Sequence, residues 1–187
     1  MEIGMRNRFA FIGGSSGRWR VTSMQSVRGD GLTPVSHVDV LTVGDAPTDP
    51  SAAWRIEGQI SNLRYATRTE VTALKSKQES LGRAHARVAA MIPIKKTASW
   101  WELAQDERRA VFEDTSRHTA IGMRYLPAVA RQLYHSRDLA QPFDFVTWFE
   151  FGRDDKQAFD DLVGLLRATP EWEFVEREFD IRLELQP

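Results

Sequence analysis

Short apolar runs separated by turn-forming residues dominate the first third of the chain. Four of them have the length and composition of β-strands, at residues 9–12, 19–24, 38–43 and 54–64. The cluster Gly13-Gly14-Ser15-Ser16-Gly17 lies between the first two runs and predicts a hairpin, whereas residues 44–50 carry the Gly, Asp and Pro of an exposed loop. From Thr67 the apolar spacing becomes helical, and we expect this helix to end at Gly82.

The second half of the chain predicts a regular succession of strands and helices. We expect strands at residues 88–94, 126–134, 143–151 and 174–185. Ser99 and Glu102 have the spacing of a capping box, which predicts a helix from Ser99 through Phe112. An amphipathic pattern predicts a second helix over residues 154–168. The order β-α-β-β-α-β is that of a ferredoxin-like unit, and with the first half it predicts an α+β fold: a large antiparallel sheet with helices on one face.

The size and composition limit the class of protein. With 187 residues, of which 42% are hydrophobic, we expect one domain over residues 1–187, made of two fused halves at 1–92 and 93–187. A formal net charge of -1 makes nucleic acid an unexpected partner. The absence of cysteine excludes disulfides and thiolate-bound metals, so any metal would use His, carboxylate or Tyr. No run reaches the roughly 18 apolar residues of a membrane span, and we expect a cytoplasmic protein without a membrane partner.

Two local features stand out as candidate chemistry. The glycine-serine cluster at residues 13–17 lacks the Gly-Lys-Ser/Thr ending of a phosphate-binding loop, which favours a hairpin. Trp100 and Trp101 are adjacent at the predicted helix start, so their indoles point in different directions. Most tryptophans pack in cores, but one of these two could face a flat cofactor.

The histidines and one arginine allow alternative interpretations. His37, His85 and His135 lie near loops or element ends and are expected at the surface, and His118 follows the predicted helix, where contact with its last carbonyls is favoured over metal binding. Arg131 falls within the apolar strand at 126–134, on the face of Val129 and Leu133. Such a guanidinium needs either a salt bridge, with Glu150, Glu171 or Glu173, or a functional pocket.

Several motifs in order resemble the chlorite dismutase family over roughly residues 60–185. They are Pro93-Ile-Lys-Lys-Thr-Ala-Ser-Trp-Trp-Glu-Leu, Ser116-Arg-His118, Ala130-Arg131-Gln-Leu-Tyr-His-Ser-Arg-Asp-Leu, Pro142-Phe-Asp-Phe-Val-Thr-Trp-Phe-Glu-Phe, Pro170-Glu171-Trp172 and Arg177-Glu-Phe-Asp-Ile-Arg-Leu. The resemblance implies a dimeric α+β barrel built from ferredoxin-like units. The chain length matches the short, dimeric branch with an abbreviated first half, which implies a homodimer, and not the longer, exported, pentameric branch.

The resemblance also implies a haem b (iron protoporphyrin IX) cofactor and assigns residues to it. His118 would be the proximal ligand of the iron and Glu171 would accept a hydrogen bond from its other nitrogen. Lys96 and Trp100 would complete this side of the haem. On the opposite face Arg131 would be the catalytic arginine with Gln78 beside it. Further residues would form the distal wall or the propionate-binding segment: Leu133, Thr147 and Phe149 for the wall, Asn62 and Tyr65 for the propionates.

By the same resemblance, the expected activity is decomposition of chlorite to chloride and dioxygen. An oxygen atom would pass from chlorite to the iron to give ferryl haem and hypochlorite, and Arg131 would retain the hypochlorite until the O–O bond forms. Small anions would then be the natural ligands. The alternatives are a coproheme decarboxylase, which typically carries glutamine where Arg131 stands, a haem-binding or peroxide-sensing protein, and a haem-free relative.

Overall fold

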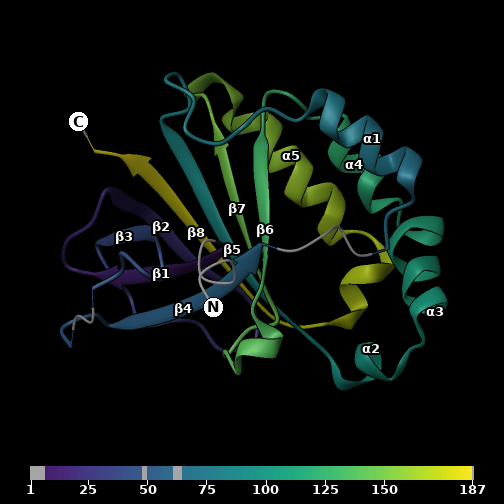
Figure 1. Cartoon of the computed structure of the whole chain (residues 1–187), viewed down its shortest axis with the longest axis horizontal. Helices are drawn as coiled ribbons and strands as arrows, with labels where there is room; N and C mark the ends of the chain where they lie inside the picture. Colours follow the sequence, from purple (N-terminus) through teal and green to yellow (C-terminus); the bar gives the residue numbers. More distant parts are fainter. Residues whose placement is uncertain (1–6, 48–49, 61–64, 187) are drawn as a thin grey trace.

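The computed structural model describes residues 7–47, 50–60 and 65–186, in which eight strands close into a barrel (Figure 1). The strands are β1 (Arg8–Gly14), β2 (Trp19–Arg28), β3 (His37–Thr42), β4 (Trp54–Ile60), β5 (Val88–Lys96), β6 (Ala130–His135), β7 (Phe145–Phe151) and β8 (Val175–Leu185). Their order around the barrel is β1-β3-β2-β8-β5-β7-β6-β4. Each half of the chain therefore forms one contiguous side, and the antiparallel pairs β2–β8 and β4–β6 join the two sides.

The helices cover the second-half side of the barrel (Figure 1). They are α1 (Arg68–Lys77), α2 (Ala98–Glu102), α3 (Gln105–Arg109), the π-helical segment η1 (Ala110–Thr115), α4 (His118–Met123) and α5 (Lys156–Arg167). Three 3-10 turns complete the set, namely η2 (Arg137–Leu139), η3 (Arg153–Asp155) and η4 (Pro170–Phe174). The predicted α+β class and the β-α-β-β-α-β order of the second half are confirmed.

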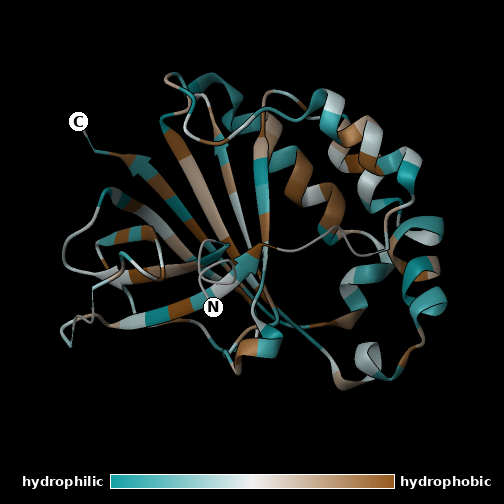
Figure 2. Cartoon of the chain, viewed as in Figure 1, coloured by the Kyte–Doolittle hydropathy of each residue, from teal (hydrophilic) through white to brown (hydrophobic). Residues whose placement is uncertain are grey.

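Two apolar cores follow from the alternation of side chains along the strands. One core fills the barrel and contains Phe11, Trp148 and Ile181. The other lies between the outer face of the sheet and α5, where Phe149 packs on Phe159. Brown and teal segments alternate along α5 in Figure 2, as its amphipathic pattern predicts. The helical side of the sheet is therefore buried as well as the interior.

The prediction of one continuous helix from Ser99 through Phe112 is wrong, because the chain forms α2, α3 and η1 there. Thr97, not Ser99, caps α2, because its hydroxyl accepts a hydrogen bond from the Trp100 amide at 3.3 Å. Leu103 is extended and ends α2, and the Glu107 carboxylate then accepts from the Ala104 amide at 2.6 Å to begin α3. Arg117 has a left-handed backbone conformation (φ 53°) and interrupts the chain once more, so α4 begins at His118.

Other boundaries also differ from the prediction. The strand expected at 126–134 begins only at Ala130, since backbone hydrogen bonds form turns through Tyr125 and Val129. The strand expected at 54–64 extends to Ile60, and residues 61–64, with the candidate Asn62, lie outside the described residues.

Candidate functional site

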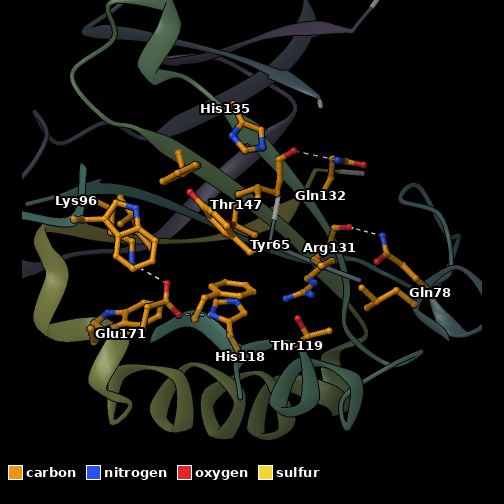
Figure 3. Close-up of a pocket in the computed structure, with 18 residues that line it drawn as sticks. Tyr65, Gln78, Lys96, His118, Thr119, Arg131, Gln132, His135, Thr147 and Glu171 are labelled. Carbon is orange, nitrogen blue, oxygen red and sulfur yellow. Dashed lines mark hydrogen bonds and ion pairs between the residues drawn. The ribbon is translucent and has the colours of Figure 1, made fainter. Parts of the chain in front are cut away.

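A pocket opens between the outer face of the sheet and the helices. Its empty space is about 1120 Å³ with the solvent-open mouth included, slightly above the roughly 300–1,000 Å³ typical of small-molecule sites. The pocket brings together nine of the candidates named above: Tyr65, Gln78, Lys96, Trp100, His118, Arg131, Leu133, Thr147 and Glu171. Phe149 lines a smaller adjoining pocket. Figure 3 shows His118 and Glu171 on one side and Arg131 on the other.

One wall carries a chain of three polar side chains. The Nδ1 atom of His118 lies 2.7 Å from Oε2 of Glu171, and Lys96 Nζ donates to Oε1 of the same carboxylate at 2.7 Å. Glu171 and Lys96 are buried. Burial alone raises the pKa of Glu171, but the electrostatic attraction and hydrogen bonds of His118 and Lys96 outweigh it and lower that pKa to about 2. The carboxylate is therefore ionised and holds His118 by one ring nitrogen.

The local fold aims the imidazole of His118 at the pocket. His118 is the first residue of α4, so the contact with C-terminal helix carbonyls favoured from sequence is wrong. The Glu113 carboxylate accepts from the Thr119 amide at 2.7 Å and fixes this helix start. Phe112 stacks on the imidazole with ring centroids 4.4 Å apart. Among the described residues Nε2 of His118 has no hydrogen-bond partner, so it is available to a ligand.

Arg131 projects from β6 into the pocket without a salt bridge among the described residues. Its candidate partners are occupied or distant: Glu150 accepts from Trp148 at 2.9 Å and from the Gly82 amide at 2.6 Å, and Glu171 binds His118 and Lys96. The structural salt bridge considered from sequence is therefore absent. Burial lowers the pKa of Arg131 and the charge of Glu113 raises it, and a guanidinium keeps its proton under both influences.

Gln78 and Gly122 set the position of Arg131. The side chain of Gln78, at the end of α1, donates to the Arg131 carbonyl at 2.8 Å. Gly122 on α4 allows the guanidinium to pack closely, because a Cβ atom there would lie 3.0 Å from Nη1. Among the described residues no carboxylate contacts this guanidinium, so the pocket presents a positive charge that favours a small anion.

Two buried donors in the pocket wall have no partner in the described part of the chain. They are the hydroxyl of Tyr65 and Nε1 of Trp100. Trp101 points elsewhere and donates to Asp144 at 3.2 Å, so the two adjacent indoles serve different surfaces as predicted. Buried donors normally find an acceptor, so a ligand with carboxylates or other acceptors fits this wall.

Nine lining residues were not among the sequence candidates, and four of these carry polar side-chain atoms: Thr119, Gln132, His135 and Trp172. His135 was expected at the surface but is buried at 8% exposure. The alternation of β6 contained the signal, because His135 follows Arg131 and Leu133 at intervals of two and so shares their face. Trp172 stood in a motif, but its direction depends on the 3-10 turn η4.

The adjoining pocket extends the site inward between α5 and strands β5 and β7. Ile92, Phe149, Val163 and Leu166 make most of its lining apolar. At its end Arg167 binds the fully buried Glu178, with Nη2 to Oε1 at 2.6 Å. His118 and Arg131 border both pockets, so the two form one continuous site.

Among the described residues no helix combines the length and apolar character of a membrane span. Nor do the described residues contain a group of three or more His, Asp or Glu placed to hold a metal ion. His118 is then a single candidate ligand, and a metal held there would need other ligands from a cofactor.

Comparisons with known proteins agree with the sequence motifs. The family model described as chlorite dismutase matches residues 55–183. A crystal structure of dimeric chlorite dismutases from Nitrobacter winogradskyi is 51% identical, with a TM-score of 0.87, and the match covers 94% of this chain and 99% of that one. A mutant chlorite dismutase from Candidatus Nitrospira defluvii is 31% identical, with a TM-score of 0.60, over 73% of this chain and 56% of that one.

A curated chlorite dismutase from Ideonella dechloratans is 40% identical over 85 residues, which is 46% of this chain and 28% of that protein. The chain thus spans less than a third of this curated relative, whereas it matches the dimeric structure almost from end to end. The family model and the dimeric structure together establish that the chain belongs to the chlorite dismutase family.

Proposed function

We propose that this protein binds haem b in the pocket and decomposes chlorite to chloride and dioxygen. One observation carries the proposal: the chain His118–Glu171–Lys96 faces the unpaired guanidinium of Arg131 across a single pocket. A metal-bound imidazole characteristically donates its second N–H to a carboxylate, as His118 can to Glu171. The family membership and the dimeric chlorite dismutase match support the choice of reaction.

The pocket residues fit a haem. The apolar inner part, with Ile92, Val163 and Leu166, suits the hydrocarbon edge of a porphyrin. The unsatisfied Tyr65 hydroxyl and Trp100 Nε1 offer donors to its propionates. Asn62 stays a candidate for the same role. Leu133, Thr147 and Phe149 project from β6 and β7 on the side of Arg131, where they would form the distal wall.

His118 would hold the cofactor through Nε2, because Nδ1 is engaged with Glu171. When bound, haem supplies the redox chemistry that removes an oxygen atom from chlorite. The ionised Glu171 would increase the basicity of the imidazole, and buried Lys96 keeps that carboxylate ionised and fixed. His118, Glu171 and Lys96 together would therefore stabilise the ferric state of the haem iron.

Arg131 would act twice on anions. Its desolvated positive charge would first attract chlorite into the pocket. It would then retain the hypochlorite in the pocket, so that this anion reacts further there and does not escape. Gln78 would contribute by fixing the Arg131 backbone through its 2.8 Å hydrogen bond.

The same residues disfavour coproheme decarboxylation. Coproheme carries two further propionates where haem b has vinyl groups, and a carboxylate placed in the adjoining pocket would lie near the buried Glu178. Burying a carboxylate next to another is costly unless a free cation receives it, and Arg167 already binds Glu178 and Asp180. Arg131 is also the residue at whose position coproheme decarboxylases typically carry glutamine.

We further propose a cytoplasmic homodimer. The abbreviated first half leaves sheet and helix surface for a second copy to cover, and the 51% identical structure is described as dimeric. Sedimentation at micromolar concentration tests this: a dimer is expected, and a monomer or a pentamer would contradict it.

The activity is tested by two successive measurements on one preparation. Adding haem to the purified protein is expected to give a Soret band, and adding chlorite to that holoprotein is expected to release dioxygen at an oxygen electrode. No Soret band would refute haem binding. A Soret band without dioxygen, together with conversion of ferric coproheme to haem b by peroxide, would favour the decarboxylase.

A further inference from the structure

A second aromatic side chain lies beside the proposed iron ligand in an unusual electrostatic setting. The ring of Trp172, in η4, is nearly parallel to that of His118, with centroids 6.3 Å apart and an interplanar angle of 19°. Trp172 borders both parts of the site and is 9% exposed. Its Nε1–H donates to Oε2 of Glu178 at 2.7 Å. A carboxylate with no exposed surface thus contacts the indole closest to the proposed iron ligand.

A buried carboxylate lies against the indole within a compact charge network. Arg167 binds Glu178 and Asp180, and Arg182 binds Asp180 and Asp160. Glu178 and Asp180 are buried and paired with these two guanidinium groups, whereas the side chain of Asp160 is 51% exposed. Glu178 is the charge in direct contact with the indole, where its carboxylate stabilises positive charge and can accept the Nε1 proton. Lys96 Nζ lies 5.6 Å from the Trp172 ring centroid and is itself paired with Glu171.

The other tryptophans of the second half lack this combination. Lys96 Nζ lies 4.5 Å over the Trp100 ring, and Nε1 of Trp100 has no carboxylate partner. Trp101 contacts Asp144 only at 3.2 Å and is flanked by the guanidinium groups of Arg137 at 3.9 Å and Arg108 at 5.2 Å.

Trp148 is the remaining comparison. It donates to Glu150 at 2.9 Å, but its side chain packs inside the barrel, on the opposite face of β7 from Thr147 and the site. Cations over a ring resist its oxidation, and distance weakens electron transfer, so Trp172 is singled out by its surroundings.

We propose that Trp172 is a one-electron relay that reduces the cofactor after it has been oxidised. The inference rests on the proposed function, because the oxidant is the haem after two-electron oxidation by chlorite or a peroxide. One electron leaves the indole and reduces the cofactor by one equivalent, while the Nε1 proton passes to Oε2 of Glu178. The neutral indolyl radical left on Trp172 is later restored by one electron from an external reductant and the returned proton.

Such a relay gives the protein a second use of oxidising equivalents. If hypochlorite escapes, the oxidised cofactor has lost the partner that would reduce it. Trp172 then holds the equivalent in η4, where its carbonyl, like that of Val175 at the start of β8, accepts a hydrogen bond from the Arg28 guanidinium at 2.8 Å. The expected electron donor is a small one-electron reductant that approaches the protein at η4, and the resulting activity is peroxidase-like.

The test uses holoprotein in which tryptophan is deuterated on its ring, mixed with peracetic acid and frozen within milliseconds. Electron paramagnetic resonance is expected to show an organic radical whose hyperfine pattern changes on deuteration. Trp172→Phe is expected to lose this signal, whereas the matched variant Trp101→Phe, outside the pocket lining, is expected to keep it. Glu178→Gln is expected to weaken the signal and Glu178→Asp to restore it, because only the carboxylates accept the proton.

The outcomes separate the relay from the proposed function. The relay would be overturned if the Trp172→Phe holoprotein gave the same tryptophan radical, or if the Glu178→Gln holoprotein gave it at full yield. Either result would leave chlorite decomposition untouched. A wild type that forms no Soret band would overturn both. If Trp172→Phe fails to take up haem, the Glu178 pair still decides, since both variants keep the indole in place.

Discussion

The Nδ1 atom of His118 and the Oε2 atom of Glu171 lie 2.7 Å apart, although 53 residues separate them in the chain. The imidazole comes from the first turn of α4 and the carboxylate from η4, so neither element alone forms the site. Because Lys96 binds the other oxygen of Glu171, the carboxylate remains ionised and leaves the imidazole a single free nitrogen. The Glu171 carboxylate thus sets both the orientation of His118 and the charge on this side of the proposed haem site.

Glu171→Gln is therefore expected to bind haem about 10- to 100-fold more weakly and to raise the Fe(III)/Fe(II) potential. The neutral amide accepts a weaker hydrogen bond from the imidazole N–H than the carboxylate does, so the imidazole becomes a less basic ligand. Haem titration and spectroelectrochemistry measure the two effects. Glu173→Gln is the matched control, since Glu173 lies two residues away and is exposed. A potential that is unchanged or lower in Glu171→Gln would contradict the role given to the carboxylate.

His118→Ala is expected to abolish stable haem binding while leaving the apolar core nearly intact, because the imidazole is at the edge of the pocket and the two cores lie elsewhere. The loss of the Soret band and a near-normal circular dichroism spectrum check both parts. His85→Ala, at an exposed histidine, serves as the control. Loss of haem in the control but not in His118→Ala would move the ligand assignment.

The sequence anticipates the parts of this structure that depend on local patterns. The strands, α5 and the isolated charge of Arg131 all follow from periodicities of a few residues. The start of α4 does not, because Arg117 adopts a left-handed conformation that arginine rarely takes. The pairing of Lys96 with Glu171 across 75 residues depends on the register of β5 with β8, so no local pattern encodes it and only the family motifs pointed to it.

Arg131→Ala is expected to bind haem and begin the reaction but to release a trappable oxidant. A hydrogen bond to a charged group contributes about 1.5–3 kcal/mol, so hypochlorite retention should fall roughly 10- to 100-fold. The total oxygen yield before inactivation should fall more than the initial rate. A chlorination trap and an oxygen electrode measure the two quantities, with exposed Arg124→Ala as the control. Equal yields in Arg131→Ala and wild type would refute the retention role.

The Glu70–Arg109 pair is expected to make stability depend on acid pH. Hydrogen bonds from Arg109 lower the pKa of Glu70 from 4.5 to about 2, and two contacts of 2.7 Å tie α1 to α3 beside Tyr65. A lowered folded-state pKa means that the stabilisation is present above pH 4.5 and is lost as pH falls toward 2. Urea unfolding should therefore show Glu70→Gln about 1 kcal/mol or less below wild type at pH 7, converging with it at low pH. A constant difference across this range would contradict the linkage.

Gly122 and Gly164 offer a matched pair of glycine-to-alanine changes in helices. A Cβ at Gly122 would lie 3.0 Å from Nη1 of Arg131, whereas one at Gly164 meets nothing within 4 Å. Gly164→Ala should raise the free energy of unfolding by about 0.5–1 kcal/mol and leave chlorite turnover unchanged, because alanine favours helices. Gly122→Ala should gain less stability, displace the guanidinium and lower the oxygen yield toward that of Arg131→Ala. Thermal unfolding and oxygen release on both holoproteins check this, and an unaltered oxygen yield in Gly122→Ala would show that the close packing on Gly122 does not position Arg131 for retention.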